Sequence, residues 1–279
     1  MTEEVLVKLR NQAEHERKKC PTRSCRKIYE YSTAPLPLGR DRCIRLLMNM
    51  GYRVLFPKRF GKATQAGSRM FPNLLVEKSV TEINQVWQAD MAHYLYGDQK
   101  YYTMYITDVY NQEIIGYGAY DTNEAINYRD VLKKAITKRE SPSCLLHDLI
   151  HHSDGGKQYE STVYTELCTQ KGIKQSMCMY SYENPYAEKT NDLINNGYLN
   201  IWRPKTLKDL QQCQKKAVTD HNKNSRKSKL GKTSPIDFRI NLKNSKTSYT
   251  LDLKPKNPEQ PRKVLSLSNL LTMTQKSVK

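Results

Sequence analysis

Residues 85–96, QVWQADMAHYLY, open the part of the chain that decides the fold. Two similar runs follow, YYTMYITDVY at 101–110 and EIIGYGAY at 113–120. All three runs are rich in tyrosine, isoleucine and valine, which favour β-strands. Turn residues such as Gly97 and Asn111 lie between them. The pattern therefore predicts three consecutive strands at the start of a sheet.

Helical and extended patterns alternate after the third run. The segment NEAINYRDVLKKAITK at 123–138 places apolar residues on one helical face. Those residues are Ile126, Val131, Leu132, Ala135 and Ile136. The elements predicted next are a buried strand at 143–153, a helix at 161–172, a fifth strand at 173–178 and a third helix that begins near Asn184. This order predicts an α/β fold in which helices cover a mixed five-stranded sheet.

Three acidic residues stand in short blocks of this core: Asp90 in VWQADMAHY, Asp154 in HHSDGGKQY and Glu188 in YENPYAEKTND. Asp90 lies in the middle of the first predicted strand, and Asp154 follows the end of the fourth. If these strands are neighbours, the two carboxylates can face each other across a spacing of about 4.8 Å. Glu188, in the first turn of its helix, can reach the same point, and Gly155 and Gly156 leave room for a bulky substrate.

Three converging carboxylates suit divalent metal ions. Mg²⁺ prefers octahedral oxygen coordination and keeps several waters, so carboxylates and substrate phosphate oxygens together would complete its ligand shell. Two such ions, about 3.5–4 Å apart, hold both the attacking and the leaving oxygen of a phosphodiester. The pattern predicts a site for two Mg²⁺ (or Mn²⁺) ions, with Asp90, Asp154 and Glu188 as catalytic residues and metal ligands.

Other polar residues near these blocks have structural alternatives. Asp108 also ends a strand, but its flank lacks the small residues that follow Asp154, so we expect it to cap a turn. His152 is expected to shape the strand end and, at most, to touch DNA. Lys189, next to Glu188, is a candidate contact for a DNA phosphate, with a solvated helix residue as the alternative.

The charge of the chain is unevenly distributed. Residues 1–84 carry 17 Lys and Arg against 8 Asp and Glu, residues 85–221 carry 15 against 17, and residues 222–279 carry 14 against 3, for a net charge of +18. Lysines and arginines that neutralise phosphates release counterions, so basic arms of this kind bind DNA with little sequence preference. The alternative is a solvated basic surface. The sharp change of sign favours a near-neutral core between two arms that bind double-stranded DNA.

Length and composition exclude other classes of protein. A chain of 279 residues can hold one core domain plus smaller attachments. It has no apolar run near the roughly 20 residues that a membrane span needs, and its start, MTEEVLV, lacks the features of a signal peptide. Seven cysteines without a CxxC pair indicate neither a disulfide framework nor a zinc site. We expect a protein of the reducing cytoplasm with no membrane contact.

The N-terminal residues 1–56 are predicted to form short helices that bind DNA. In GRDRCIRLLMNMGY, residues 39–52, apolar residues fall at helical spacing with arginines opposite, and Gly51 supplies a C-terminal stop. An arginine-faced amphipathic helix suits a helix-turn-helix DNA binder, although ordinary helix packing gives the same stripe. The candidate DNA contacts on this helix are Arg40, Arg42 and Arg45.

The chain divides where its composition changes. Residues 57–83 are basic and contain prolines and glycines, which predicts a linker. Residues 84–221 form the predicted catalytic core. Residues 222–279 are predicted to be a basic C-terminal segment that is partly disordered.

Together these segments resemble DDE transposases with a retroviral-integrase-type catalytic core. More narrowly, they resemble the second-reading-frame (OrfB) transposases of bacterial insertion sequences, over roughly residues 20–240. The matching segments are WQAD (87–90), ITDVY (106–110), IIGY (114–117), HHSDGGKQY (151–159), GIKQSM (172–177), YENPYAEKTND (182–192), INNGYL (194–199), LGRDRCIRLLMNMGY (38–52) and KTSPIDFR (232–239). Each segment alone would be a weak signal, but jointly they are specific.

The resemblance implies a ribonuclease H-like fold and DNA cleavage followed by strand transfer. Asp90, Asp154 and Glu188 correspond to the acidic triad that binds metal in that family. The spacing of 33 residues between Asp154 and Glu188 departs from the family's usual 35. The implied partners are the element ends and target as double-stranded DNA, further copies of the chain on that DNA, and a helix-turn-helix protein from an upstream reading frame. The implied location is the bacterial cytoplasm, on the nucleoid.

Two other functions stay open. The first is a structure-specific nuclease on the same fold, which would cut DNA without joining it. The second is a non-catalytic or decayed relative that only binds DNA. The basic helical segment before the core argues against the first, and the intact acidic triad argues against the second.

Overall fold

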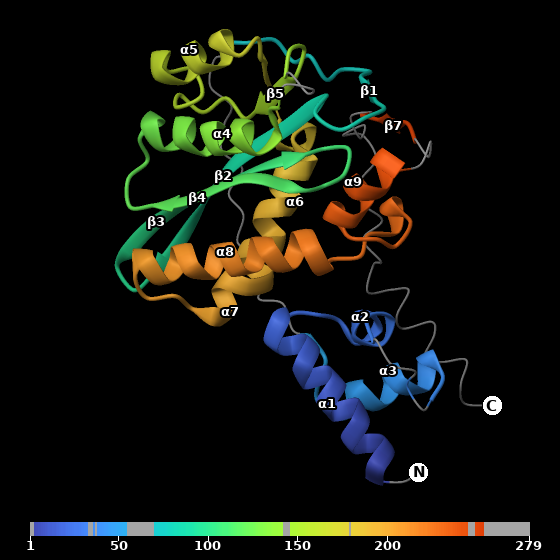
Figure 1. Ribbon diagram of the computed structural model, residues 1–279. Coiled ribbons are helices and arrows are strands. Elements are labelled where there is room, and N and C mark those ends of the chain that lie inside the picture. The colour runs from blue at the N-terminus through green and yellow to red at the C-terminus, as the bar shows by residue number, and fades with distance from the viewer. Residues whose placement is uncertain are drawn as a thin grey trace, which may run out of the picture.

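The structure, a computed structural model, describes residues 3–32, 36, 38–54, 70–141, 146–178, 180–244 and 249–253. At its centre lies a five-stranded sheet (Figure 1). The strands are β2 (Val86–Tyr96), β3 (Gln99–Asp108), β4 (Ile114–Tyr120), β5 (Ile150–Ser153) and β6 (Lys174–Met177). Their spatial order is β4-β3-β2-β5-β6, with β2, β3 and β4 antiparallel and β2, β5 and β6 parallel. The predicted mixed sheet is confirmed, and its topology is ribonuclease H-like.

Helices cover both faces of this sheet (Figure 1). They are α4 (Ala125–Arg139), α5 (Thr162–Gln170), α6 (Pro185–Ile194) and α8 (Leu207–Asn224). On one face α4 and α5 cover a core that contains Trp87 and Ile106. On the other face α6 and α8 cover a core that contains Tyr94 and Tyr105. Both layers follow from alternation along the strands, because successive side chains point to opposite faces.

The prediction that Ile126 lies on the buried face of α4 is wrong. The other members of that face are buried, but Ile126 is 37% exposed, and Tyr128 is buried instead. Each helical residue advances by about 100°, so Ile126, five residues before Val131, lies on the opposite side of the helix. Tyr128 precedes Val131 by three residues and shares its side.

Beyond α6 the chain forms elements that were not predicted from the sequence. The helix continues through a π-helical turn (Asn195–Leu199) into α7 (Asn200–Trp202). Arg203, at a φ of 50°, ends this run. The long helix α8 then begins after Thr206, whose side chain accepts a hydrogen bond from the N–H of Asp209 at 3.1 Å, a normal N-cap.

Three helices form a separate group at the N-terminus, as predicted. They are α1 (Glu3–Lys19), α2 (Cys25–Glu30) and α3 (Arg40–Asn49). They share a small core in which Leu9, Ile28 and Leu47 are fully buried. Gly51 has a φ of 86° just after α3, which is the expected helix stop. Figure 1 shows this group on the side of α8 that faces away from the sheet.

Arg23 connects the N-terminal helices to the core. Its buried guanidinium forms ion pairs with Glu16 of α1 and with Asp220 of α8, the latter at 2.8 Å between Nη2 and Oδ2. The hydroxyl of Thr22 donates a hydrogen bond to the carbonyl of Gly197 at 3.2 Å. Removing one partner of a buried ion pair costs about 3–5 kcal/mol, so these polar contacts fix the position of the helical group.

Segments that precede and follow the predicted core in the sequence pack against one end of the sheet. The elements there are β1 (Ser79–Val80), α9 (Pro235–Asn244) and β7 (Leu251–Asp252), with β1 paired to β7. Val80 and Tyr110 are buried in this cluster, and Tyr249 packs against it. Residues 70–83 of the predicted linker and the described part of the C-terminal segment are therefore folded. The prediction was that the segment 222–279 is partly disordered, and its residues 245–248 and 254–279 lie outside the described residues.

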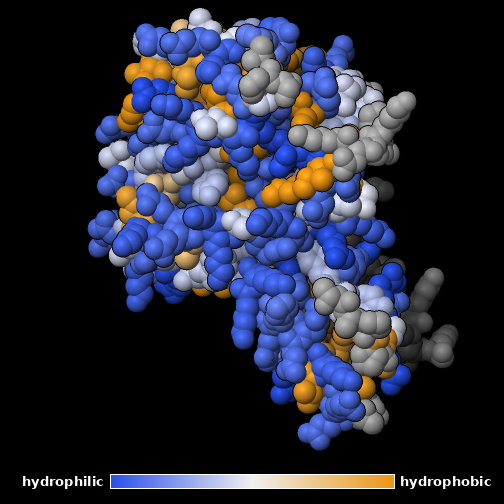
Figure 2. Space-filling model, in the orientation of Figure 1, coloured by the Kyte–Doolittle hydropathy of each residue, from blue (hydrophilic) through white to orange (hydrophobic). Residues whose placement is uncertain are grey.

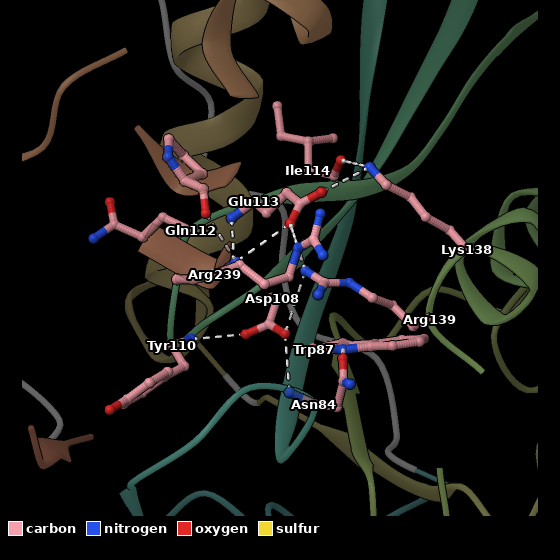
Figure 3. A network of polar contacts seen from close by, with 12 residues as sticks. Asn84, Trp87, Asp108, Tyr110, Gln112, Glu113, Ile114, Lys138, Arg139 and Arg239 are labelled. Atoms are coloured by element: carbon pink, nitrogen blue, oxygen red, sulfur yellow. Dashed lines mark hydrogen bonds and ion pairs between the residues drawn. The ribbon is translucent and has the colours of Figure 1, made fainter. Parts of the chain in front are cut away.

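A network of charged side chains holds the turn between β3 and β4 (Figure 3). Glu113 is fully buried, and its carboxylate meets Arg139 of α4 at 2.8 Å and Arg239 of α9 at 2.9 Å. Lys138 contacts the second oxygen at 3.0 Å. Several cations keep the pKa of Glu113 below its usual value, Arg139 first among them, even though burial opposes them.

Asp108 belongs to this structural network. Its two carboxylate oxygens accept hydrogen bonds from the N–H groups of Tyr110 and Asn84, at 3.0 and 2.9 Å. The side chain is fully buried and points at the turn (Figure 3). The prediction that Asp108 caps a turn is confirmed.

The surface seen in Figure 2 is mostly hydrophilic over the N-terminal helices and α8. Exposed apolar side chains such as Val76 and Leu95 come from separate elements. Among the described residues, no helix combines the length and the apolar character that crossing a membrane requires.

Candidate active site

Asp90 and Asp154 come from neighbouring strands. β2 and β5 run parallel, and the last residue pair of their ladder is Gln88 opposite His152. Two residues further along each chain, the same register places Asp90 opposite Asp154, directly after the end of β5. The strands are therefore the neighbours that were predicted. Their spacing of about 4.8 Å puts the two carboxylates on adjacent positions of the sheet.

The start of α6 is fastened to β2 by hydrogen bonds from its entry segment. The Asn184 side chain donates to the carbonyl of Ala89 at 2.9 Å. The N–H of Tyr186 donates to Oε1 of Gln88, also at 2.9 Å. Asn184 and Gln88 are both buried, so these bonds are shielded from water and set where the first turn of α6 begins.

A third hydrogen bond brings Glu188 toward the same strand. Asn191 Nδ2 donates to Asp90 Oδ2 at 2.8 Å. Glu188 precedes Asn191 by three residues, so both side chains lie on one face of α6. Glu188 is exposed, in the first turn of the helix, as expected from the sequence. The acidic group (Asp90, Asp154 and Glu188) is thus assembled from a strand, a strand end and a helix.

The electrostatics of Asp90 reflect these neighbours. Its pKa is raised to about 7, chiefly by burial and then by the negative charges of Asp154 and Glu188. The hydrogen bond from Asn191 opposes the shift without cancelling it. A carboxylate whose pKa is raised by two neighbouring carboxylates lies in a negative field. Such a field favours the binding of protons or other cations at the site.

Asp154 has a more open setting than Asp90. It keeps an exposed edge, and the N–H of Gly156 donates to its Oδ1 at 3.2 Å. Desolvation still raises the pKa of Asp154. A side chain at Gly156 would begin 3.1 Å from that oxygen, whereas nothing lies within 4 Å at Gly155. The glycine pair therefore leaves the Asp154 carboxylate uncovered.

The donor set fits a divalent cation in chemistry and charge. Carboxylate oxygens are the ligands that Mg²⁺ prefers, and neither Asp90 nor Asp154 has a lysine or arginine ion pair within the described ranges. In that same part of the chain, however, no three His, Cys, Asp or Glu side chains stand close enough together to hold a metal ion. The charges of the three carboxylates in the acidic group interact, but the carboxylates are not close enough together to coordinate one metal ion.

His152 was predicted to shape the strand end and, at most, to touch DNA. The side chain is fully buried, and its Nδ1 hydrogen-bonds with Ser176 Oγ at 2.8 Å. Ser176 belongs to β6, the outer strand, so His152 fastens β5 to β6. Its neighbour His151 is also buried and hydrogen-bonds with Tyr164 of α5. Both histidines shape the strand end, which is the other role that was predicted.

The remaining predicted DNA contacts are exposed. Lys189 lies on α6 beside Glu188, and Arg40, Arg42 and Arg45 lie on α3. Arg40 forms an ion pair with its neighbour Asp41 at 2.8 Å. The three arginines are far from the acidic group in the fold, whereas Lys189 is next to it. Contact of these four residues with DNA stays a prediction.

Three residues that position the acidic group were missed: Gln88, Asn184 and Asn191. Each stands inside a quoted block, VWQAD or YENPYAEKTND. In the sequence, each of these amide side chains lies two to four residues from a carboxylate, and this proximity could have indicated their role. Their partners, however, lie about one hundred residues away in the sequence.

Comparisons with known proteins agree with this geometry. Residues 80–180 match the integrase core domain family. A 31 kDa protein of insertion element IS600 from Shigella sonnei is 29% identical over 208 residues, 72% of this chain and 75% of that protein. A transposase for insertion sequence element IS629, also from Shigella sonnei, is 28% identical over 178 residues, 63% of this chain and 57% of that protein.

Among solved structures, the chain is similar to the HTLV-2 integrase catalytic core domain in complex with magnesium. The identity is 22%, the TM-score is 0.44, and the match covers 60% of this chain and 96% of that chain. Residues 80–180 thus match an integrase core domain, and the chain is similar to proteins of bacterial insertion sequences, as its motifs indicated. The matched region spans only a little over half of the IS629 transposase.

Proposed function

We propose that this protein is a transposase that cleaves DNA at the ends of a bacterial insertion sequence and joins those ends to a target. The observation that carries the proposal is the acidic group, in which the β2–β5 register sets Asp90 of β2 opposite Asp154, directly after the end of β5, and Asn191 of α6 bonds to Asp90. The relatives encoded by insertion elements support the same class of function.

Asp90, Asp154 and Glu188 are the residues that would hold two Mg²⁺ or Mn²⁺ ions. Bound ions of this kind lower the pKa of the attacking water or hydroxyl and stabilise charge on the leaving oxygen. Asn191 keeps the Asp90 carboxylate oriented toward the helix that carries Glu188. The uncovered carboxylate of Asp154 leaves the side of the site next to Gly155 open to a phosphodiester.

The reaction needs no covalent link between DNA and protein. Water attacks the phosphodiester at the element end, and the bond to the leaving oxygen breaks to release a 3′-hydroxyl. That hydroxyl then attacks a phosphodiester of the target, so one phosphodiester replaces another. The second step needs no nucleotide energy source, and the sequence contains no GxxxxGK[ST] loop.

The substrate is double-stranded DNA, both as element ends and as target. A net charge of +18 favours its binding. Exposed Arg40, Arg42 and Arg45 on α3 suit contacts with an element end, and Lys189 suits a phosphate near the acidic group. Transposition joins two ends, so the active form is a homo-oligomer on DNA in the bacterial cytoplasm. A helix-turn-helix protein from an upstream frame is a further proposed partner.

The test is a joining assay with the full chain. The donor carries the inverted repeats that flank the coding sequence, the target is a supercoiled plasmid, and Mg²⁺ or Mn²⁺ is present. Donor ends covalently joined to the plasmid support the proposal. Cleaved donor without joining would identify a structure-specific nuclease.

A non-catalytic DNA-binding relative is the second candidate. It is favoured by one observation, that the acidic group of the described chain does not stand at coordination distance. Binding of the donor without cleavage or joining, with either metal, would support this alternative and contradict the transposase proposal.

A further inference from the structure

Four lysines from three separate segments gather beside α6. Lys27 comes from α2, Lys189 from α6, and Lys227 and Lys229 from the loop that follows α8. Lys27 and Lys189 line a cleft of about 530 Å³ between the N-terminal helices and α6. Lys189 and Lys229 line a second cleft, of about 500 Å³, which also contains Glu188. Lys189 lies where the two clefts meet, next to the acidic group.

The lysine cluster (Lys27, Lys189, Lys227 and Lys229) shares its two clefts with four carboxylates. Asp192 lines the first cleft, and Glu183, Glu188 and Asp252 line the second. Across the described segments, the ion pairs involve none of the four ammonium groups of the cluster. Lysines elsewhere form ion pairs, for example Lys171 with Glu140 at 2.7 Å and Lys174 with Asp148 at 2.6 Å.

Mutual repulsion within the cluster is strong enough to affect its ionisation. The pKa of Lys227 is lowered to about 7, first by burial and then by the charges of Lys189 and Lys27. The buried imidazole of His221 feels the same field, and its pKa is well below the usual value, with burial as the main cause.

Solvated surface lysines can avoid this repulsion by turning away from each other. Here Lys27 and Lys227 are half-buried, and Arg23 and Tyr31 fix their segments. The N–H of Arg226 donates to the hydroxyl of Tyr31 at 2.7 Å, which ties the loop after α8 to the end of α2. The fold therefore keeps Lys27 and Lys227 in place near the exposed Lys189 and Lys229. A polyanion with closely spaced charges is the ligand that such an arrangement favours.

We propose that the lysine cluster binds consecutive phosphates of the DNA strand that passes the acidic group, so that N-terminal helices, core and C-terminal segment grip one backbone together. This proposal rests on the proposed function, because it assumes that the strand meets Glu188. Glu188 and Lys189 are consecutive on α6, and their side chains diverge by about 100°. A strand that leaves the carboxylates on one side of α6 meets Lys189 next and then the first cleft.

The test measures binding without chemistry. The full chain is titrated with a random-sequence duplex in EDTA at several NaCl concentrations between about 50 and 200 mM. The triple variant Lys27→Gln, Lys227→Gln and Lys229→Gln is compared with a matched triple variant of exposed lysines elsewhere, Lys133→Gln, Lys208→Gln and Lys215→Gln. Each lysine that neutralises a phosphate contributes about 0.9 to the slope of log K against log salt.

We expect the slope of the cluster variant to become shallower by about 2.7, with an affinity loss on the order of 100-fold at low salt. The matched variant should keep the wild-type slope. Because three repelling charges are removed, the unfolding midpoint of the DNA-free cluster variant should stay equal or rise, which separates weak binding from misfolding. If the triple variant does not fold, Lys227→Gln alone should make the slope shallower by about 0.9.

An unchanged slope, or an equal change in both triple variants, would overturn the proposal. Inorganic phosphate provides a second arm. If it raises the wild-type unfolding midpoint but not that of the cluster variant, while the DNA slopes agree, the site takes a small anion and the DNA assignment is wrong. Neither readout requires cleavage, so a wild type that binds with the expected slope but joins no DNA would refute the transposase function and leave the phosphate site in place.

Discussion

The acidic group and the lysine cluster meet on α6, at Glu188 and Lys189, and show the same kind of charge imbalance with opposite sign. In the acidic group, burial and two neighbouring carboxylates raise the pKa of Asp90 to about 7. In the lysine cluster, burial and two neighbouring ammonium groups lower the pKa of Lys227 to about 7. In each case the protein holds like charges together without an ion-paired protein partner for Asp90 or Lys227 in the described chain. Each arrangement is stabilised by a ligand of opposite charge, metal ions on one side and phosphates on the other.

The largest expected effect comes from the acidic group. Asp90→Asn, Asp154→Asn or Glu188→Gln should each lower the cleavage rate on the order of 10³-fold or more, because a lost metal ligand removes several kcal/mol of transition-state stabilisation. Affinity for duplex DNA should stay within a factor of about three, since the lysine cluster is untouched. Rates on a labelled donor and binding in EDTA give both numbers. Cleavage at the wild-type rate by any one variant would remove that residue from the site.

The next effect is on stability and depends on pH. Asp90 has a folded pKa of about 7, against about 3.9 when unfolded. Between these values the folded state binds more protons than the unfolded state, so its stability falls as the pH rises through this window. Asp90 is half-buried, so we discount the full shift and expect a loss of about 2 kcal/mol between pH 5 and 8 in EDTA.

Urea unfolding of wild type and Asp90→Asn at both pH values measures this difference. The variant should lack the loss, because its amide does not ionise, and other titrating groups cancel in the comparison. Equal pH dependence in the two proteins would show that Asp90 is not the carboxylate whose pKa is raised in the folded protein.

The arginines of α3 are candidates for recognising the DNA sequence, whereas the lysine cluster is proposed to bind only the DNA backbone. Arg42 and Arg45 are three residues apart and share one helical face. An arginine that pairs with guanine discriminates by about 1–3 kcal/mol, so Arg42→Ala or Arg45→Ala should reduce preference for an element end over a scrambled duplex. Titrations at one fixed salt concentration measure the ratio. An equal loss on both duplexes would mean that α3 contacts phosphates alone.

The smallest effect is a change in protonation. At pH 8 Lys227, with a pKa of about 7, is mostly neutral in the free protein, and a phosphate nearby would raise its pKa and recruit a proton. Lys189, Lys27 and His221 face Lys227 from α6, α2 and α8, and their repulsion is the part that DNA would offset. Calorimetry in two buffers of different ionisation enthalpy should detect uptake approaching one proton, which Lys227→Gln should lack.

The two regions also differ in how far they could be predicted from the sequence. Asp90 and Asp154 were found because strand patterns and short local blocks place each carboxylate at a defined point of the sheet. The bond from Asn191 to Asp90 was not found, because it joins residues 101 positions apart. The lysine cluster was missed for the same reason, since three distant segments meet only once Arg23 and Tyr31 have fixed the N-terminal helices.

Burial accounts for most of the remaining differences. His152 looked accessible beside Asp154, but β6 supplies Ser176 and covers it. The C-terminal segment was predicted to be basic and partly disordered, yet its Tyr249 stacks on Tyr110 with ring centroids 4.5 Å apart. In both cases a local pattern gave the residue's chemistry correctly, and the partner that buries it came from an element far along the chain.

Metal binding by the DNA-free protein shows whether the acidic group holds divalent cations. The free Mn²⁺ signal in electron paramagnetic resonance is followed as wild type, Asp90→Asn and Asp154→Asn are added at pH 8. We expect wild type to remove Mn²⁺ from solution and each variant to bind much less. Binding to wild type should weaken as the pH falls through about 7, where Asp90 takes up its proton. Wild-type binding that equals the variants, or no binding by any of the three, would contradict a metal site at Asp90, Asp154 and Glu188.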